Sequence, residues 1–190
     1  MLLGLAVTAG WLTWFDLPVM HAVALTDASP TWLVTAARFI TRLGDPDPRS
    51  GFVVIACIVF IARHCWRSAV VYLLTVVLSI GGHTLAKLAF ARPRPRLTPW
   101  LDQVADLSYP SGHADGAMVI LLGAVLLMRE RWLRWPALTL ALAIAATRPM
   151  LGVHWPTDVI GGAVWGAGFG LIGAGVAGAM GFPKARMLEG

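Results

Sequence analysis

The chain has 190 residues, a length that suits a single domain. Apolar residues make up 57% of the chain and charged residues only 13%, which excludes an ordinary soluble domain of this size. The formal net charge is +5, but the basic residues cluster beside the apolar runs. This placement indicates that the positive charge interacts with lipid headgroups and sets the membrane topology, and it argues against a nucleic acid as the partner.

The first part of the chain predicts one membrane helix and one amphipathic helix. Residues 2–15 are apolar and would form a helix of roughly 21 Å, short for a hydrocarbon core of about 30 Å. After the helix-start signal Ser29-Pro30, residues 31–43 place apolar side chains on one face and polar ones on another. We expect this helix to lie at the membrane interface, with an ordinary solvated face on a packed helix as the alternative. The sequence GDPDP at residues 44–48 ends it.

Five more apolar segments follow, at residues 52–62, 69–91, 112–128, 135–151 and 157–180. With the first helix they predict an all-α, polytopic membrane protein: a bundle of six transmembrane helices that forms one domain over residues 1–190. In the last segment a small residue recurs every four positions, as Gly162, Gly166, Gly170, Ala174 and Gly178. Such a stripe lets helices pack closely, and we expect it to serve packing inside the bundle, which favours a monomer over a homodimer.

The basic residues also predict the orientation. Six spans put the even-numbered loops and the C-terminal tail on one side, and these short stretches carry Arg63, Arg67, Arg129, Arg131, Arg134, Lys184 and Arg186. The opposite side has eight basic residues against these seven, but most of the eight are explained by the polar site described next. The remaining bias predicts a bacterial-type inner (plasma) membrane protein whose site faces the periplasmic or outer side.

Three polar islands interrupt the apolar sequence, at residues 87–95 (KLAFARPRP), 109–113 (YPSGH) and 147–158 (TRPMLGVHWPTD). So many ionisable groups at the ends of membrane segments would be costly unless something binds there. The islands contain Lys87, Arg92, Arg94, His113, Arg148, His154 and Asp158. Four cations and two imidazoles facing one carboxylate suit a phosphate and not a metal cation. No Cys/His spacing is typical of a zinc site, so neither a metal nor another cofactor is expected.

The spacing within the islands indicates separate roles. Pro-Ser-Gly-His opens an apolar run, so Ser111 is a plausible N-cap of a helix whose first backbone N–H groups would bind an anion. Asp158 lies four residues after His154 and could hold its ring, which leaves His113 free to move a proton. His83, one turn before Lys87, lines the floor of the site or is a hydrogen-bonded interior histidine.

In this order, the patterns Lys-x6-Arg-Pro (87–95), Pro-Ser-Gly-His (110–113) and Arg-x5-His-x3-Asp (148–158) resemble the type-2 phosphatidic acid phosphatase superfamily. One departure is visible. The third motif usually begins Ser-Arg, and here it reads Thr147-Arg148, which keeps a hydroxyl that could still bind phosphate.

The resemblance implies a metal-free reaction in two steps. His154 would attack phosphorus and become phosphorylated, Asp158 would orient it, and His113 would protonate the leaving oxygen and then activate water. The phosphate would be bound by Lys87, Arg94, Ser111, Gly112 and Arg148, with Arg92, Thr147 and His83 as further candidates.

The implied partners are the bilayer and a membrane lipid phosphate: phosphatidylglycerol phosphate, phosphatidate or undecaprenyl diphosphate. Two alternatives stay open. One is a phosphotransferase of the same family, and the other is a non-catalytic protein that binds or transports lipid phosphates. An intact set of His113, His154 and Asp158 argues against the second, because binding alone needs no nucleophile.

Overall fold

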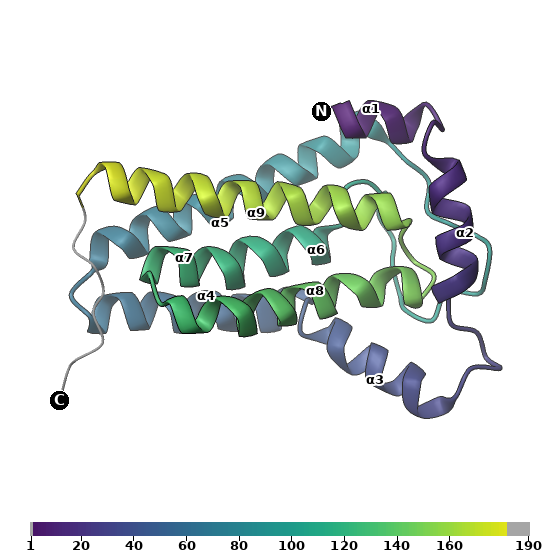
Figure 1. Cartoon of the computed structure of the whole chain (residues 1–190), viewed down its shortest axis with the longest axis horizontal. Helices are drawn as coiled ribbons and strands as arrows, with labels where there is room; N and C mark the ends of the chain where they lie inside the picture. The colour runs from purple at the N-terminus through teal and green to yellow at the C-terminus, as the bar shows by residue number, and fades with distance from the viewer. Residues whose placement is uncertain (1, 182–190) are drawn as a thin grey trace.

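The computed structural model describes residues 2–181, and the regular structure within this range is helical. The elements are α1 (Leu2–Thr8), α2 (Thr13–Val23), α3 (Thr31–Arg42), α4 (Pro46–Ala62), α5 (Trp66–Phe90), α6 (Gly112–Ala117), η1 (Met118–Leu122), α7 (Gly123–Met128), η2 (Arg131–Leu133), α8 (Arg134–Met150) and α9 (Pro156–Ala179). Helices α4 to α9 run lengthwise in one bundle, α2 crosses one end of it, and α3 projects beside that end (Figure 1). The all-α bundle expected from the sequence is confirmed.

The number of membrane spans is only partly settled. Helices α5 and α9 are long and apolar enough to cross a membrane, and α1 with α2 would make a third span if read as one broken helix. The other three predicted spans are shorter; α4 and α8 have 17 residues each, or about 26 Å. The count of six therefore stays a prediction.

The expected first helix over residues 2–15 is wrong. The chain breaks after Thr8, and α2 leaves at 78° to α1 (Figure 1). Gly10 lies in the break with φ +75°, a left-handed conformation through which an α-helix cannot continue. Apolar composition alone did not reveal this turn, which sends α2 across the end of the bundle.

The corner between α3 and α4 is packed directly against one site residue. A Cβ at Gly44 would lie 2.6 Å from the ring of His113, so only glycine fits there. The GDPDP sequence ends α3 as predicted, but α4 begins at Pro46 and not at residue 52, because proline is tolerated in the first turn of a helix. The first turn of α4 is therefore brought up to the site.

Helix α3 has the predicted amphipathic character. Ala37 and Thr41 are buried, while Trp32 is 71% exposed and Phe39 66% exposed. The helix packs on α8 through its inner face. Large exposed aromatic side chains beside a membrane bundle support the interfacial position, which stays a prediction.

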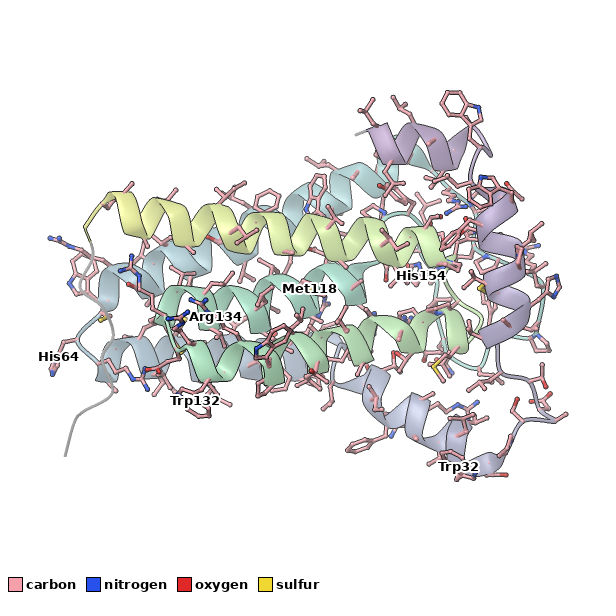
Figure 2. All side chains as sticks on the ribbon, viewed as in Figure 1. Trp32, His64, Met118, Trp132, Arg134 and His154 are labelled. Atoms are coloured by element: carbon pink, nitrogen blue, oxygen red, sulfur yellow. The ribbon has the colours of Figure 1, made fainter. Side chains whose placement is uncertain are left out.

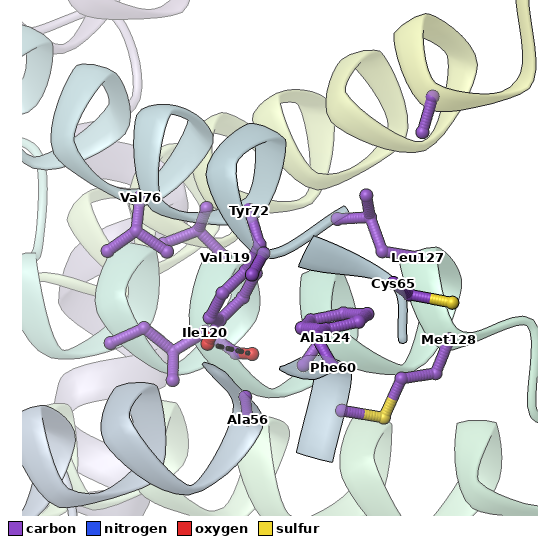
Figure 3. Close-up of a cluster of buried hydrophobic side chains, with 12 residues drawn as sticks. Ala56, Phe60, Cys65, Tyr72, Val76, Val119, Ile120, Ala124, Leu127 and Met128 are labelled. Carbon is purple, nitrogen blue, oxygen red and sulfur yellow. Dashed lines mark hydrogen bonds between the residues drawn. The ribbon is translucent and has the colours of Figure 1, made fainter. Parts of the chain in front are cut away.

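The apolar core away from the site joins α4, α5 and the α6–α7 helix (Figure 3). Phe60 and Tyr72 pack at its centre, and the Tyr72 hydroxyl donates to the Ile120 carbonyl at 3.1 Å. Ile120 lies in η1, a π-helical turn where the regular hydrogen-bond ladder is interrupted. The buried Tyr72 hydroxyl is thus hydrogen-bonded to a backbone carbonyl in this interrupted turn.

The first three glycines of the α9 stripe pack inside the bundle as expected, Gly162 and Gly166 against the start of α6 and Gly170 against Gly123 of α7. A Cβ at Gly162 would come within 2.3 Å of the Ser111 carbonyl oxygen, and one at Gly166 within 2.3 Å of the Asp115 carbonyl oxygen. These glycines let the α9 backbone lie directly on the turn that carries Ser111. The preference for a monomer stays a prediction.

Candidate functional site

A cavity of about 370 Å³ brings all three polar islands together. The motif residues that line it are Lys87, Arg94, Gly112, His113, Arg148 and His154. His154 lies toward the end of the bundle crossed by α2, whereas His64 and Trp132 lie toward the opposite end (Figure 2). The site and the basic loop around Trp132 therefore occupy opposite ends of the molecule.

Prolines and one left-handed residue explain why these side chains meet. Helix α5 presents Lys87 in its last turn and ends at Ala91, whose φ is +46°. Pro93 and Pro95 then prevent helix formation, so the chain returns over the site as a loop that carries Arg94. Pro156 sits in the first turn of α9, which leaves His154 in the turn just before that helix.

His154 is held as a neutral imidazole whose Nε2 carries no proton. The side chain is 2% exposed, and Nε2 lies 3.0 Å from Nη1 of Arg94. A guanidinium can only donate, so Nε2 accepts and the ring proton is on Nδ1. Burial, together with the charges of Arg94 and Arg148, holds the pKa of His154 well below its usual range. The lone pair that a nucleophile needs is thus at Nε2.

Asp158 faces the other nitrogen of that ring. Its Oδ2 lies 3.6 Å from Nδ1 of His154, longer than a hydrogen bond, and accepts from Ser108 Oγ at 2.5 Å and from the Trp155 backbone N–H at 2.9 Å. The bond to Trp155 caps the start of α9. The Asp158 carboxylate therefore both caps the start of α9 and faces the His154 ring.

Arg92 lies behind Asp158 and is absent from the cavity lining. It donates from Nη1 to Oδ1 of Asp158 at 2.5 Å and from Nη2 to Oδ2 of Asp16 at 2.7 Å. Asp16, on α2, is fully buried and also accepts from the backbone N–H and the hydroxyl of Thr157, at 2.9 and 2.7 Å. Arg92 thus holds Asp158 in place, which differs from the phosphate contact considered for it.

The cations expected to bind phosphate are paired with carboxylates of the loop. Lys87 and Arg94 both form ion pairs with Asp106. Arg148 donates to Asp102 at 2.6 Å. Burial alone would raise the pKa of Asp106, but the hydrogen bonds and charges of the two cations outweigh it and hold the pKa at about 2. In this structure, carboxylates of the protein are therefore paired with the three cations expected to bind phosphate.

His113 lines the cavity beside the start of α4. Its Nε2 lies 3.1 Å from Oδ1 of Asp45, and its side chain is 17% exposed. Burial and the neighbouring charge of Asp102 raise the pKa of Asp45. His113 is therefore cavity-lining and paired with a carboxyl group.

The remaining candidates divide into those in the cavity and those outside it. Gly112 and His83 line the cavity, and Nδ1 of His83 lies 3.0 Å from Oδ2 of Asp115. Ser111 occupies the N-cap position of α6, but its hydroxyl is buried and makes no hydrogen bond with any residue in 2–181. Thr147 is buried outside the cavity lining, and its hydroxyl donates to the Ile144 carbonyl at 2.6 Å, so it is engaged within α8.

Six residues of the site were not found from the sequence: Asp16, Asp45, Arg49, Asp102, Asp106 and Ser108. All six lie outside the three motifs, and only the tertiary contacts reveal them. The one available signal was Asp16, an acid within an apolar run, which is costly in a membrane segment unless it is paired.

A metal centre is not evident in the described part of the chain. Residues 2–181 contain no group of three or more His, Cys, Asp or Glu side chains placed to hold a metal ion. The expectation of metal-free chemistry stays a prediction.

Comparison with known proteins gives three findings. The model of the PAP2 superfamily matches residues 68–178. The undecaprenyl-diphosphatase BcrC of Bacillus subtilis is 33% identical over 84 residues, 42% of each chain, and a lipid A 4'-phosphatase of Bacteroides thetaiotaomicron is 31% identical over 120 residues, 55% of this chain and 53% of its own. The chain thus spans about half the length of these curated relatives.

A solved structure is similar over almost the whole fold. It is a transmembrane PAP2-type phosphatidylglycerolphosphate phosphatase from Bacillus subtilis, with a TM-score of 0.83, 24% identity, and coverage of 94% of this chain and 92% of its own. At this identity the match shows a shared fold.

Proposed function

Because this chain belongs to the PAP2 superfamily, we propose that it is a membrane phosphatase that removes a terminal phosphate from a lipid through a phosphohistidine. The observation that carries the proposal is the state of His154. Its Nε2 accepts from Arg94 inside a cavity lined by cations, and its Nδ1 faces the buried carboxylate of Asp158. A histidine fixed in this tautomer is prepared to attack phosphorus.

The cavity has the groups that each step requires. A phosphate would displace Asp106 and Asp102 from Lys87, Arg94 and Arg148, which then bind its equatorial oxygens where charge shifts during transfer. Nε2 of His154 forms the bond to phosphorus, and Asp158 stabilises the positive charge that develops on the ring.

His113 would serve the leaving group. It lines the same cavity as the nucleophile and can give a proton to the departing oxygen, and later take one from the water that hydrolyses the phosphohistidine. No step in this scheme uses a metal ion.

The substrate we propose is a lipid phosphate whose headgroup reaches the cavity from the membrane. Candidates are undecaprenyl diphosphate, phosphatidylglycerol phosphate and phosphatidate, and the relatives named above add lipid A. The apolar helices around the site and the exposed aromatic residues of α3 favour a lipid-anchored substrate over a soluble one.

We also propose six spans, with the cavity on the periplasmic or outer side of an inner membrane. The basic loop that includes Arg129, Arg131 and Arg134 lies at the opposite end of the bundle from His154, as this orientation requires (Figure 2). A Gln103→Cys variant that lacks Cys57 and Cys65 should react with an impermeant thiol reagent in intact cells, because Gln103 is exposed at the cavity. Labelling only after lysis would reverse the orientation.

The function is tested with the purified protein in detergent. Inorganic phosphate release is measured from each of the four lipids named above, with His154→Ala as the control. Release by the wild type that disappears in the variant supports the proposal. Transfer of the phosphate to another lipid without release would indicate the phosphotransferase, and binding without either reaction would indicate the non-catalytic protein.

A further inference from the structure

Arg49, in the first turns of α4, is a cation of the cavity that none of the three motifs contains. Its Nη1 donates to the Gly112 carbonyl at 3.0 Å, next to His113 in the chain. Arg49 therefore lies beside the chain segment that carries His113, the residue proposed to protonate the leaving group.

The partners of Arg49 distinguish it from the other cations of the site. Lys87 and Arg94 share Asp106, and Arg148 is paired with Asp102. Within residues 2–181 no carboxylate forms a salt bridge with Arg49, although Asp115 and Asp45 are near enough for their charges to act on it. One bond to a neutral carbonyl leaves most of its five N–H donors available, although the side chain is half-buried against α6.

We propose that Arg49 binds a second phosphate on the leaving-group side, so that the site is built for lipid diphosphates. This inference rests on the phosphatase function proposed above and specifies its substrate class. The terminal phosphate would bind to Lys87, Arg94 and Arg148, and the phosphate attached to the lipid would bind to Arg49. A guanidinium is the side chain best suited to that contact, because it binds phosphate oxygens with two parallel donors.

The chemistry of a diphosphate explains why a cation is useful at this position. Nε2 of His154 bonds to the terminal phosphorus while the bond from that phosphorus to the bridging oxygen breaks. The electron pair remains on the bridging oxygen, which becomes an oxygen of the released lipid monophosphate. Arg49 stabilises the charge that gathers there. Water then cleaves the phosphohistidine to inorganic phosphate and returns the electron pair to Nε2.

The test compares farnesyl diphosphate with farnesyl monophosphate, which share one tail, in detergent with the purified enzyme. Arg49→Gln should lower the ratio of kcat/KM for diphosphate to that for monophosphate by roughly 10- to 100-fold, the usual effect of losing a hydrogen bond between charged groups. Arg49→Lys, which keeps the charge but not the fork, should lower the ratio by less. The matched control is Arg42→Gln, an exposed arginine at the end of α3 outside the cavity lining, and it should leave the ratio unchanged.

A binding measurement separates recognition from folding. Methylene diphosphonate and inorganic phosphate are compared as inhibitors, and Arg49→Gln should weaken only the diphosphonate. An equal loss on both substrates and both inhibitors would show that Arg49 merely joins α4 to α6, and would overturn the inference. A wild type that releases no phosphate from either substrate would instead refute the phosphatase function itself.

Discussion

Replacing Asp106 should change the affinity of the enzyme for its substrate. Its carboxylate forms ion pairs with both Lys87 and Arg94, so an incoming phosphate must displace it. Asp106→Asn removes the competing charge and keeps the size of the side chain. We therefore expect a lower KM for the lipid substrate and a lower Ki for vanadate, which imitates the transferring phosphoryl group.

The size of the effect follows from the exposure of the carboxylate. The Asp106 side chain is 60% exposed, and ion pairs of that kind contribute about 0.2–1 kcal/mol each. Two such pairs give about 0.4–2 kcal/mol, which corresponds to a KM roughly 2- to 30-fold lower. With a pKa of about 2, Asp106 loses its charge only as the pH falls toward that value, so mild acid will not reproduce the variant.

The assay is phosphate release as a function of lipid concentration at fixed detergent, with vanadate inhibition measured in parallel. Asp47→Asn is the matched control, because Asp47 is an exposed acid of α4 outside the cavity lining and tests the change in net charge alone. A raised KM in Asp106→Asn would refute the reasoning, since it would mean that Asp106 holds Lys87 and Arg94 in their productive positions.

Three further predictions follow from the site. His113→Ala should lower kcat on phosphatidate by about 10²–10⁴-fold, but less on a lipid diphosphate, whose leaving group needs no proton; equal losses in steady-state assays would contradict its role as acid. Asp16→Asn should lower kcat by about 10-fold or more with little change in KM, because Asp16 acts on Asp158 through Arg92, and a change confined to thermal stability would show a purely structural role. Activity should persist in excess EDTA; a loss that Mg²⁺ restores would disprove metal-free chemistry.

The sequence was informative where chemistry depends on residue type and order. The three motifs predicted that Lys87, Arg94, His113, Arg148 and His154 would meet, and the structure brings them to one cavity. Helix periodicity and proline signals likewise predicted α3 and the start of α9. These features are local, so a short stretch of sequence contains the information.

The features that were missed depend on contacts between distant segments. Asp16 and Arg92 are 76 residues apart, and Arg49 and Gly112 are 63 apart. Nothing in either segment indicates its partner, because one charged residue in an apolar run predicts a partner without identifying it. The bend between α1 and α2 was missed because hydropathy measures composition and not direction.

The close contact of α9 with α6 has a consequence for how such a site can change during evolution. Because Gly162 and Gly166 leave no room for a single added methyl group, a larger residue at either position would push α9 away from α6 and from the turn that carries Ser111. The residues of the loop at 96–106 are, by contrast, mostly exposed or half-buried. We therefore expect changes in lipid preference to arise from substitutions in this loop, and not from substitutions where α9 packs on α6.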